Sequence, residues 1–383
     1  MQFEINFFNE SNDEGSLEPM EIAREAGRAK IKVIGVGGGG TNSVNRMIEA
    51  GVSGVEFIAM NTDAQVLEPC AAPQKLQLGS NLTKGLGVGG DPELGKQSAE
   101  ENLPDIRRIL EGANMVFIAA GMGGGTGTGA SPVIAEASKE MGALTVAVVT
   151  RPFSFEGPRR ARVADQGINA LREKVDTLIT IPNDRLMSVV EKKATLKEAC
   201  KVADDVVRQG VQGISDIITI PGMINVDFAD VKTIMRDQGT ALMGIGTANG
   251  EQKAIHAAEM ACASPLLETT IDGARGVLMN ITGGPDLTLA EVYEAAEIVY
   301  KACDTENVNV IFGTVIDERM HNEVKITVLA TGFDGARPER VEARAAAVAV
   351  EDAEGGPVAA APLAEGTLLP EGDLEIPAFL RRR

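Results

Sequence analysis

Short, mostly apolar runs alternate with longer segments of helical spacing between residues 30 and 181. Most of these runs lack the polar–apolar alternation of a half-exposed strand, so they resemble strands that helices cover on both faces. Strands that alternate with helices in this way predict an α/β fold with a doubly wound parallel sheet. The predicted strands are 30–36, 55–60, 75–78, 115–118, 144–149 and 177–181.

The second half of the chain has a different pattern. A long helix is expected from Thr195, a capping residue, to Gln212, and Gly210 and Gly213 suggest its end. Four further strands and two helices then predict a second, smaller α+β domain. The strands are expected at 239–248, 276–282, 308–315 and 323–331, and the helices at 252–262 and 289–302.

Both ends of the chain lose this periodicity. The first 29 residues are acidic, and residues 343–372 are rich in Ala, Gly, Pro and Glu, which predicts disordered tails. A compact apolar cluster with a basic end closes the sequence, and it suggests either a partner-binding peptide or an ordinary disordered tail. The expected organisation is an acidic mobile extension (1–29), a nucleotide-binding domain (30–194), a connecting helix and turn (195–223), the α+β domain (224–332), a linker (333–371) and a terminal peptide (372–383).

Composition excludes several classes of function. The formal net charge is −19, so neither nucleic-acid binding nor adsorption to anionic lipid is expected. Four scattered cysteines and two histidines give no zinc spacing and argue against a Ser-His or Cys-His catalytic pair. We find no signal peptide and no apolar run of membrane-spanning length, so we expect a cytoplasmic protein without direct membrane insertion.

A glycine-rich loop follows the first predicted strand. Gly35, Gly37 and Gly40 satisfy the GxGxxG spacing of dinucleotide-binding proteins. Asp63 follows the next strand, where an NAD enzyme would hold a ribose. An NAD-linked oxidoreductase is therefore one alternative that these residues leave open.

A second and richer glycine loop spans residues 121–129, with six glycines in nine positions. It lies between an apolar run and a helix-like segment at 132–141. Successive glycines let backbone N–H groups converge, and a helix N-terminus adds positive partial charge, so this loop is a candidate phosphate cradle. Thr126 and Thr128 could add hydroxyls for a phosphate or a metal ion. A flexible turn without a ligand is the other interpretation.

Two cradles at one sheet edge suit a triphosphate better than a dinucleotide. No GK[ST] motif is present, so this is not a P-loop protein. Neither loop contains a lysine, so we expect Mg²⁺ to balance the remaining charge. Arg160, four residues after Glu156, is the candidate for an additional cationic contact.

The sequence Gly-Gly-Gly-Thr-Gly-Thr-Gly at 123–129 resembles the signature of the tubulin and FtsZ superfamily. Further segments resemble its FtsZ branch in particular, and the similarity extends from about residue 30 to 332. These segments are 31–40, 61–65, 155–157, 181–184 and 225–231. The terminal segment 376–380 resembles the adaptor-binding tail of that branch.

The resemblance implies a GTPase that assembles head-to-tail into filaments and forms the bacterial division ring. It implies that the two loops bind the phosphates, that Glu156 holds the ribose and that Arg160 reaches the sugar-phosphate region. Asn183 and Asp204 would recognise guanine, whose N1–H and N2–H₂ donors a carboxylate can accept. From spacing alone, Asn183 is a helix cap and Asp204 part of a solvated helix face. The implied phosphate contacts are Gly38, Gly39, Gly40, Thr41, Asn42, Gly125, Thr126 and Gly127.

The segment around Asp227 and Asp230 has two interpretations. By spacing, Asp227 is an N-cap and Asp230 its capping partner. The resemblance implies instead that both carboxylates, supported by Asn225, reach the nucleotide of the next subunit and orient the attacking water. Hydrolysis would then require assembly. A filament that binds GTP with negligible turnover is the remaining alternative.

The resemblance also implies partners and a location. The segment Asp373–Arg383 would bind membrane adaptors and regulators of division, and the protein would gather as a ring under the membrane. Cys200 departs from the family pattern, which often has phenylalanine there. It lies one helical turn before Asp204, so stacking on the base is expected to be weaker.

Overall fold

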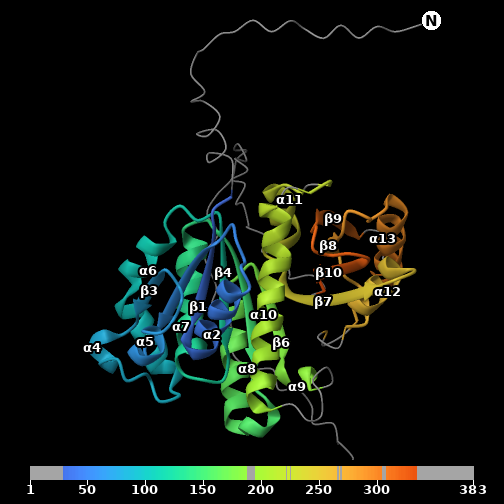
Figure 1. Ribbon diagram of the computed structural model, residues 1–383. Helices are drawn as coiled ribbons and strands as arrows, with labels where there is room; N and C mark the ends of the chain where they lie inside the picture. The colour runs from blue at the N-terminus through green and yellow to red at the C-terminus, as the bar shows by residue number, and fades with distance from the viewer. Residues whose placement is uncertain are drawn as a thin grey trace, which may run out of the picture. The chain divides into compact units, whose positions relative to one another are not determined.

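The computed structural model describes residues 29–187, 195–220, 222–224, 226–264, 267, 270–303 and 308–333, which all belong to one compact unit of the chain. Ten strands form one sheet in the order β3-β2-β1-β4-β5-β6-β7-β10-β8-β9 (Figure 1). The predictions for the acidic extension, the linker and the terminal peptide lie outside the described residues, except for residues 29 and 333.

The first six strands form the parallel part of the sheet. Their positions agree with the predicted runs to within about three residues, because all of them except the third are apolar strands whose residues are mostly buried. The strands are β1 (Ile31–Val36), β2 (Glu56–Asn61), β3 (Gln74–Gln77), β4 (Met115–Gly121), β5 (Leu144–Arg151) and β6 (Thr177–Pro182).

Helices cover both faces of this parallel part, as a doubly wound fold requires. In β1, Ile31 and Val33 belong to one core and Ile34 and Val36 to the other. Buried residues of α2 (Gly37–Glu49), α10 (Leu196–Thr219) and α11 (Phe228–Met235) pack into the first core. The second core contains residues of α5 (Pro92–Glu101), α6 (Leu103–Leu110), α7 (Thr126–Glu140) and α8 (Pro158–Arg172).

Helices α2 and α7 begin inside the glycine motifs, and α7 starts at Thr126 rather than at the predicted 132. Glycine has a low helix propensity, which is why the pattern placed the start of α7 too late. Here the glycines are needed for packing. A Cβ at Gly129 would lie 1.9 Å from the Pro92 carbonyl oxygen, so only glycine lets α7 approach α5.

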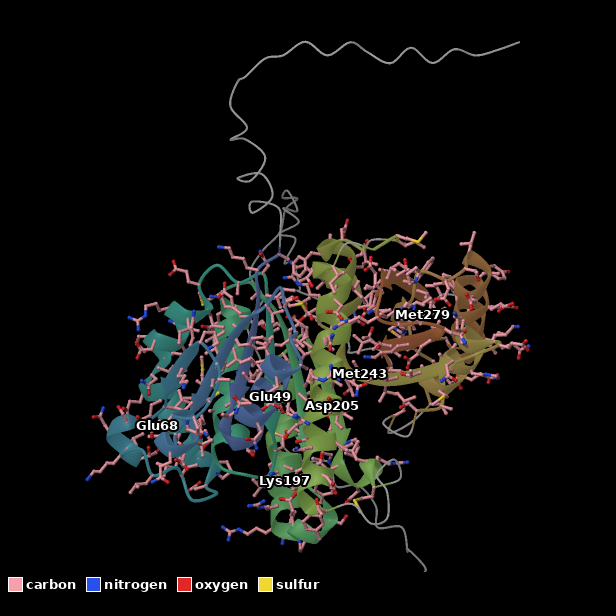
Figure 2. The ribbon with its side chains drawn as sticks, viewed as in Figure 1. Glu49, Glu68, Lys197, Asp205, Met243 and Met279 are labelled. Carbon is pink, nitrogen blue, oxygen red and sulfur yellow. The ribbon has the colours of Figure 1, made fainter. Side chains whose placement is uncertain are left out.

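Helix α10 also extends beyond the predicted end, through both Gly210 and Gly213 to Thr219. Its first residue follows Thr195, which forms the predicted cap, with Glu198 completing a capping box. A Cβ at Gly210 would lie 2.9 Å from Sδ of Met243, and one at Gly213 would lie 3.0 Å from Thr327 Cγ2. Met243 is labelled in Figure 2. These glycines therefore permit close packing against the sheet and do not terminate the helix.

The C-terminal domain continues the same sheet through β7 (Gly239–Asn249). The first three residues of β7 pair in parallel with β6, and its later residues pair antiparallel with β10. A third core lies under α12 (Lys253–Cys262) and α13 (Leu289–Cys303). The predicted α+β pattern is confirmed, with strands β8 (Gly276–Gly283), β9 (Asn309–Ile316) and β10 (Glu323–Thr331). Within the described ranges, no helix combines the length and apolarity needed to cross a membrane.

Candidate functional site

The loops after β1, β4, β5 and β6 meet at the carboxyl edge of the parallel strands, where such sheets bind ligands. A pocket of about 300 Å³ lies there. Eight of the residues predicted from the sequence line it: Gly38, Gly39, Gly125, Thr126, Gly127, Glu156, Arg160 and Asn183. Its other lining residues are Gly121, Met122, Gly124, Thr150 and Pro152. Thr150 and Pro152 were missed, although their position at the end of β5 is a signal that could have found them.

The two glycine loops pack directly against each other. Gly37 has a positive φ of 68°, and a Cβ there would lie 2.8 Å from the Gly127 nitrogen. A Cβ at Gly39 would lie 3.1 Å from the Gly121 nitrogen. By contrast, a Cβ at Gly38 or Gly124 would meet nothing within 4 Å. The backbone at these two positions is therefore open to a ligand that comes close to the main chain.

The helices that start in these loops lack side-chain caps. Val36 and Gly125, at the N-cap positions of α2 and α7, make no side-chain capping bond, and neither first turn contains an acidic residue. In contrast, Asp91 caps α5 and Thr195 caps α10. The first turns of α2 and α7 therefore keep N–H groups without a capping acceptor, next to each other and with aligned helix dipoles. Such a pair of helix ends is suited to a polyanion.

The threonine hydroxyls hold the loops together. Thr41, only 1% exposed, donates to the Gly37 carbonyl oxygen at 2.8 Å. Thr128 accepts from the Gly123 N–H at 2.9 Å, and the hydroxyls of Thr126 and Thr62 are 2.7 Å apart.

Three of the predicted phosphate contacts do not line the pocket. Gly40 and Thr41 are buried, and a Cβ at Gly40 would lie 2.2 Å from the Ala119 carbonyl oxygen. Asn42 is exposed on the second turn of α2. Gly40 and Thr41 therefore support the first loop from below.

A carboxylate and a guanidinium form one wall of the pocket. Glu156 ends the short helix η1 (Ser154–Glu156), and Arg160 lies on the first turn of α8. The two side chains form an ion pair. Glu156 Oε1 also accepts from the Phe153 N–H at 2.9 Å, so its carboxylate is oriented by the backbone of its own turn.

Asn183 has a buried polar atom without a partner. It begins α9 (Asn183–Leu186) directly after β6, and its side chain is 9% exposed. Among the described residues, nothing hydrogen-bonds to its Oδ1. Leaving a buried acceptor unpaired costs about 1–3 kcal/mol, so this atom indicates a ligand with a hydrogen-bond donor. Guanine has such donors on one edge.

Asp204 lies half-buried on α10, outside the pocket lining. Desolvation raises the pKa of its carboxyl to about 6, although a 3.3 Å bond from the Ser43 hydroxyl and the charge of Arg46 oppose the shift. Cys200 lies one helical turn before Asp204, and its thiol is exposed. Its pKa is raised by desolvation and, to a smaller extent, by the charges of Asp204 and Glu156. The Cys200 thiol is thus close enough to both carboxylates to be affected by their charge. Because Glu156 lines the pocket, this part of α10 lies near the pocket.

Asp227 and Asp230 lie at the start of α11, where Asp227 accepts from the Asp230 N–H at 2.8 Å. The predicted N-cap is confirmed, while both side chains are exposed and neither lines the pocket. Asn225 lies outside the described residues. The 24 residues of α10 span about 36 Å and separate α11 from α9 (Figure 1). One chain therefore carries the pocket and the acidic helix start at different places.

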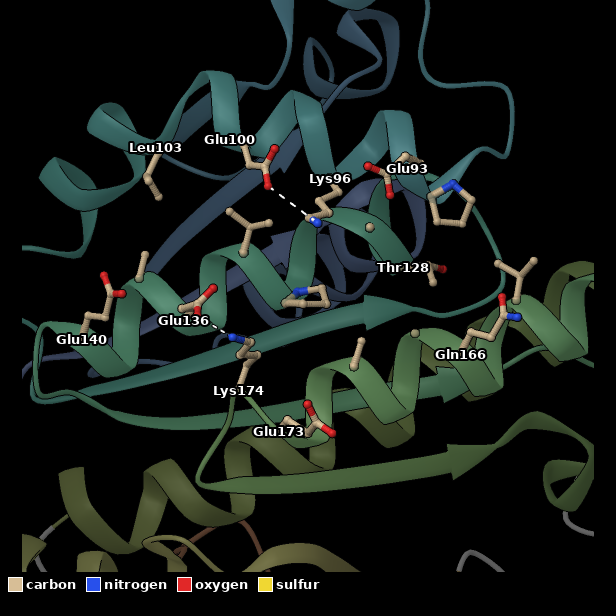
Figure 3. A pocket seen from close by; sticks show the side chains of 18 of the residues that line it. Glu93, Lys96, Glu100, Leu103, Thr128, Glu136, Glu140, Gln166, Glu173 and Lys174 are labelled. Atoms are coloured by element: carbon tan, nitrogen blue, oxygen red, sulfur yellow. Dashed lines mark hydrogen bonds and ion pairs between the residues drawn. The ribbon is translucent and has the colours of Figure 1, made fainter. Parts of the chain in front are cut away.

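Two larger hollows lie elsewhere. A groove of about 480 Å³ separates α5, α7 and α8 (Figure 3), and a hollow of about 580 Å³ lies beside α10. In the groove, Lys96 pairs with Glu100 at 3.9 Å, and Lys174 pairs with Glu136. Neither hollow is lined by any of the glycine-loop residues that line the smaller pocket, so volume alone does not identify the site.

The NAD alternative finds little support in the geometry. Asp63 accepts from the Gln65 N–H at 2.9 Å and caps α3 (Ala64–Leu67), and it does not line the pocket. The second glycine loop, which a single dinucleotide fold would not need, is half of the pocket wall.

Comparisons with known proteins agree with this geometry. Residues 30–191 match the model of the Tubulin/FtsZ family, GTPase domain, and residues 239–334 match the FtsZ family, C-terminal domain. A structure of an empty FtsZ dimer from M. jannaschii is 44% identical, with a TM-score of 0.78, and the match covers 83% of this chain and 92% of that one. A point mutant of M. jannaschii FtsZ is also 44% identical, with a TM-score of 0.77 over 82% and 94% of the two chains.

A more distant likeness shows the fold alone. A GTPγS-bound protofilament of CetZ2 from Haloferax volcanii is 23% identical, with a TM-score of 0.68, over 82% of this chain and 95% of that one.

Proposed function

The chain belongs to the tubulin/FtsZ family of GTPases, and from this premise we propose that it hydrolyses GTP only as an assembled filament. One subunit would hold the nucleotide, and the acidic helix start of the next subunit would complete the site. The observation that carries this proposal is the separation, within one chain, of the pocket from Asp227 and Asp230.

In the proposed complex the triphosphate lies against the uncapped starts of α2 and α7. The backbone N–H groups of residues 38–39 and 125–127 donate to phosphate oxygens, and Arg160 adds a positive charge. The open space over Gly38 and Gly124 supports this placement, because it lets phosphate oxygens approach the main chain.

The nucleoside lies between Glu156 and the start of α10. Glu156 accepts from ribose hydroxyls, and Asn183 Oδ1 accepts from a guanine donor, which satisfies its unpaired oxygen. Asp204 accepts from the guanine N1–H and N2–H₂ pair, which adenine cannot offer. Gly40 and Thr41 support the loop in this proposal, because both are buried beneath it.

Magnesium enters the proposal as part of the substrate. Within the described ranges, no group of three or more His, Cys, Asp or Glu side chains could hold a metal ion. The only carboxylate that lines the pocket belongs to Glu156, which is paired with Arg160. The described residues therefore offer no cage for Mg²⁺, and in this proposal the nucleotide phosphates and water would hold it. No catalytic step is assigned to it.

Asp227 and Asp230 of one subunit would position the water that attacks the γ-phosphorus bound to its neighbour, with Asn225 in support. The bond to the β-phosphate oxygen breaks, and a carboxylate accepts a proton of the water. Both carboxylates are exposed in the single chain, so they are accessible to a neighbouring subunit.

Head-to-tail stacking would bring these two surfaces together, and each exposes apolar side chains. Phe155 is 66% exposed beside the pocket, and Met223 is 79% exposed shortly before Asp227. A heterologous contact that buries them gives a filament when the rotation between successive subunits does not close a ring. The 44%-identical M. jannaschii structure described as a dimer supports self-association.

The cellular role follows from the family and is a proposal as a whole. The filament would form a division ring in the cytoplasm under the membrane. Its own body would contact neither lipid nor nucleic acid, and Asp373–Arg383 would bind membrane adaptors and regulators.

The test is a titration of protein concentration with GTP, ATP or NADH, in which pelleting and phosphate release are both measured. We expect GTP to give both signals, rising steeply above a threshold concentration. Pelleting without phosphate release would support a filament with negligible turnover. Binding of NADH without binding of GTP would favour the oxidoreductase.

A further inference from the structure

Two loops of the pocket are fastened together by a pair of residues that do not line it. Asp184, the second residue of α9, accepts from the Ser154 N–H at 2.9 Å through Oδ1. Its Oδ2 accepts from the Ser154 hydroxyl. One carboxylate thus takes both hydrogen bonds that Ser154 can donate. We call this pair the Ser154–Asp184 bracket.

The bracket connects the two segments that carry the nucleoside contacts. Ser154 begins η1, which ends at Glu156. Asp184 follows Asn183, whose unpaired oxygen faces no protein donor among the described residues. The strands that precede the two segments are parallel neighbours, with Arg151 opposite Pro182. The bracket therefore fixes the distance between the Glu156 carboxylate, which is proposed to bind the ribose, and Asn183 Oδ1, which is proposed to bind the base.

Contacts inside η1 transmit this restraint to Glu156. The Phe153 N–H donates to Glu156 Oε1 at 2.9 Å, and Phe153 is buried. The rings of Phe153 and Phe155 stack with centroids 5.0 Å apart. Residues 153–156 thus form one rigid turn, and its contact with α9 runs through Ser154.

We propose that Asp184 is a positioning residue for ribose recognition, which holds the turn of Glu156 against α9 so that the carboxylate meets the sugar hydroxyls. This inference deepens the proposed function and rests on it. Asp184 touches no substrate in this account. It restricts the motion of a solvent-exposed turn before the nucleotide binds. Without this restraint, part of the free energy of nucleotide binding would be spent on ordering the turn.

The inference makes a prediction that a general structural role does not. Without the bracket, Glu156 loses its fixed position, while the phosphate loops and Asn183 keep theirs. Binding of GTP should weaken about three- to tenfold, the range expected for one net hydrogen bond. Binding of 2′,3′-dideoxy-GTP, which has no ribose hydroxyl for Glu156, should not change.

The experiment measures the affinity of the full chain for GTP and 2′,3′-dideoxy-GTP by isothermal titration calorimetry. The variants are Asp184→Ala, Ser154→Ala and Glu156→Gln. Asp317→Ala is the matched control, because Asp317 also accepts from a main-chain N–H and a side chain, both of Arg319, in the C-terminal domain. The measured quantity is the preference for GTP over 2′,3′-dideoxy-GTP. We expect Glu156→Gln to abolish this preference and Asp184→Ala to remove most of it. Ser154→Ala should remove less, because its main-chain N–H remains. The control should retain the wild-type preference.

Unchanged dideoxy-GTP affinity shows that a variant is folded, because base and phosphate contacts remain. Equal losses for both nucleotides in Asp184→Ala, or no loss for either, would overturn the inference. If Glu156→Gln keeps the preference, the ribose assignment of the proposed function is wrong and the inference fails with it. If Glu156→Gln loses the preference and Asp184→Ala does not, only the bracket is wrong.

Discussion

At the scale of single residues, two side chains assigned to the nucleotide lie in surroundings that are unfavourable without a ligand. Asn183 has a buried oxygen without a partner among the described residues, and Asp204 is a half-buried carboxyl with a displaced pKa. Both are unfavourable in the isolated protein, and both become favourable when a ligand supplies donors. The proposed guanine contacts would supply such donors.

The titration of Asp204 gives a prediction about pH. Burial raises its pKa to about 6, so the folded chain binds this proton more tightly than the unfolded chain. This group therefore makes stability fall as pH rises from about 4 to about 6. In the proposed complex GTP needs the ionised form, so its affinity should fall about tenfold between pH 7 and pH 5.

Calorimetry at several pH values checks this, with Asp204→Asn as the control. The variant should bind GTP more weakly at pH 7 and lack most of the dependence on pH. Protonation of GTP itself affects both proteins equally, so the difference between them isolates Asp204. Identical pH profiles for the two proteins would show that Asp204 does not contact the base.

At the scale of elements, the uncapped starts of α2 and α7 are the central feature. Some other helices receive a side-chain cap, as α5 does from Asp91, whereas α8 and α9 beside the pocket do not. The two helices that begin in the glycine motifs also receive none, and they start side by side at the pocket, so their N–H groups are available to a ligand. Such helix ends favour an anion and gain stability from any negative charge placed near them.

Gly38→Asp should therefore affect stability and binding in opposite directions. A side chain at Gly38 meets no protein atom within 4 Å, and an aspartate in the first turn of α2 stabilises the helix by about 0.3–1 kcal/mol. The same charge repels the phosphates, so GTP affinity should fall by about a hundredfold or more.

Thermal unfolding without nucleotide and calorimetry with GTP measure the two effects, and Gly38→Asn has the same shape without the charge. A lower melting temperature together with unchanged GTP affinity would contradict the role of α2 as a phosphate-binding element. Similar GTP affinities for Gly38→Asp and Gly38→Asn would show that the negative charge does not cause the loss of binding.

The sequence predicted strands better than helix ends, for a physical reason. A buried strand such as β5 is apolar along its length, and this pattern is local. The start of α7 and the end of α10 depend on glycines that allow contacts with distant segments, and no local pattern contains those contacts. The glycine loops and Glu156 could be predicted from motifs. The unpaired oxygen of Asn183 and the Ser154–Asp184 bracket could not, because they arise only when β5 and β6 lie side by side.

At the scale of the whole molecule, one continuous sheet joins two domains with different tasks. The parallel part forms the pocket, and β7 extends the sheet into the C-terminal domain. Helix α10 lies between the pocket and the acidic start of α11, and its packing on the sheet holds the two surfaces at a constant separation. A rigid spacing of this kind suits a subunit that must contact identical copies at both ends.

The terminal peptide is expected to act independently of this body. Deletion of residues 372–383 should leave GTP-dependent pelleting and phosphate release unchanged, because none of the residues assigned to the pocket or to α11 is removed. Binding to a membrane adaptor should be lost. A pull-down with an adaptor, beside a sedimentation assay, checks both. Adaptor binding that survives the deletion would refute the role of the peptide.

Removal of the Asp230 carboxylate should reduce GTP hydrolysis without reducing GTP binding. Asp230→Ala changes an exposed side chain that does not line the pocket of its own chain. GTP affinity should stay within about twofold, while phosphate release should fall by about a hundredfold or more. Calorimetry and a phosphate-release assay measure the two values. Loss of GTP binding in the monomeric variant would place Asp230 in its own subunit's site and contradict the account.

The most direct measurement of the shared site is phosphate release from a mixture of two inactive variants. Asp230→Ala has an intact pocket, and Gly38→Asp has an intact acidic helix start. An equimolar mixture should recover activity, up to about a quarter of the wild-type rate if subunits mix at random in a head-to-tail filament. A mixture as inactive as its components would contradict the claim that two copies of the chain build one hydrolytic site.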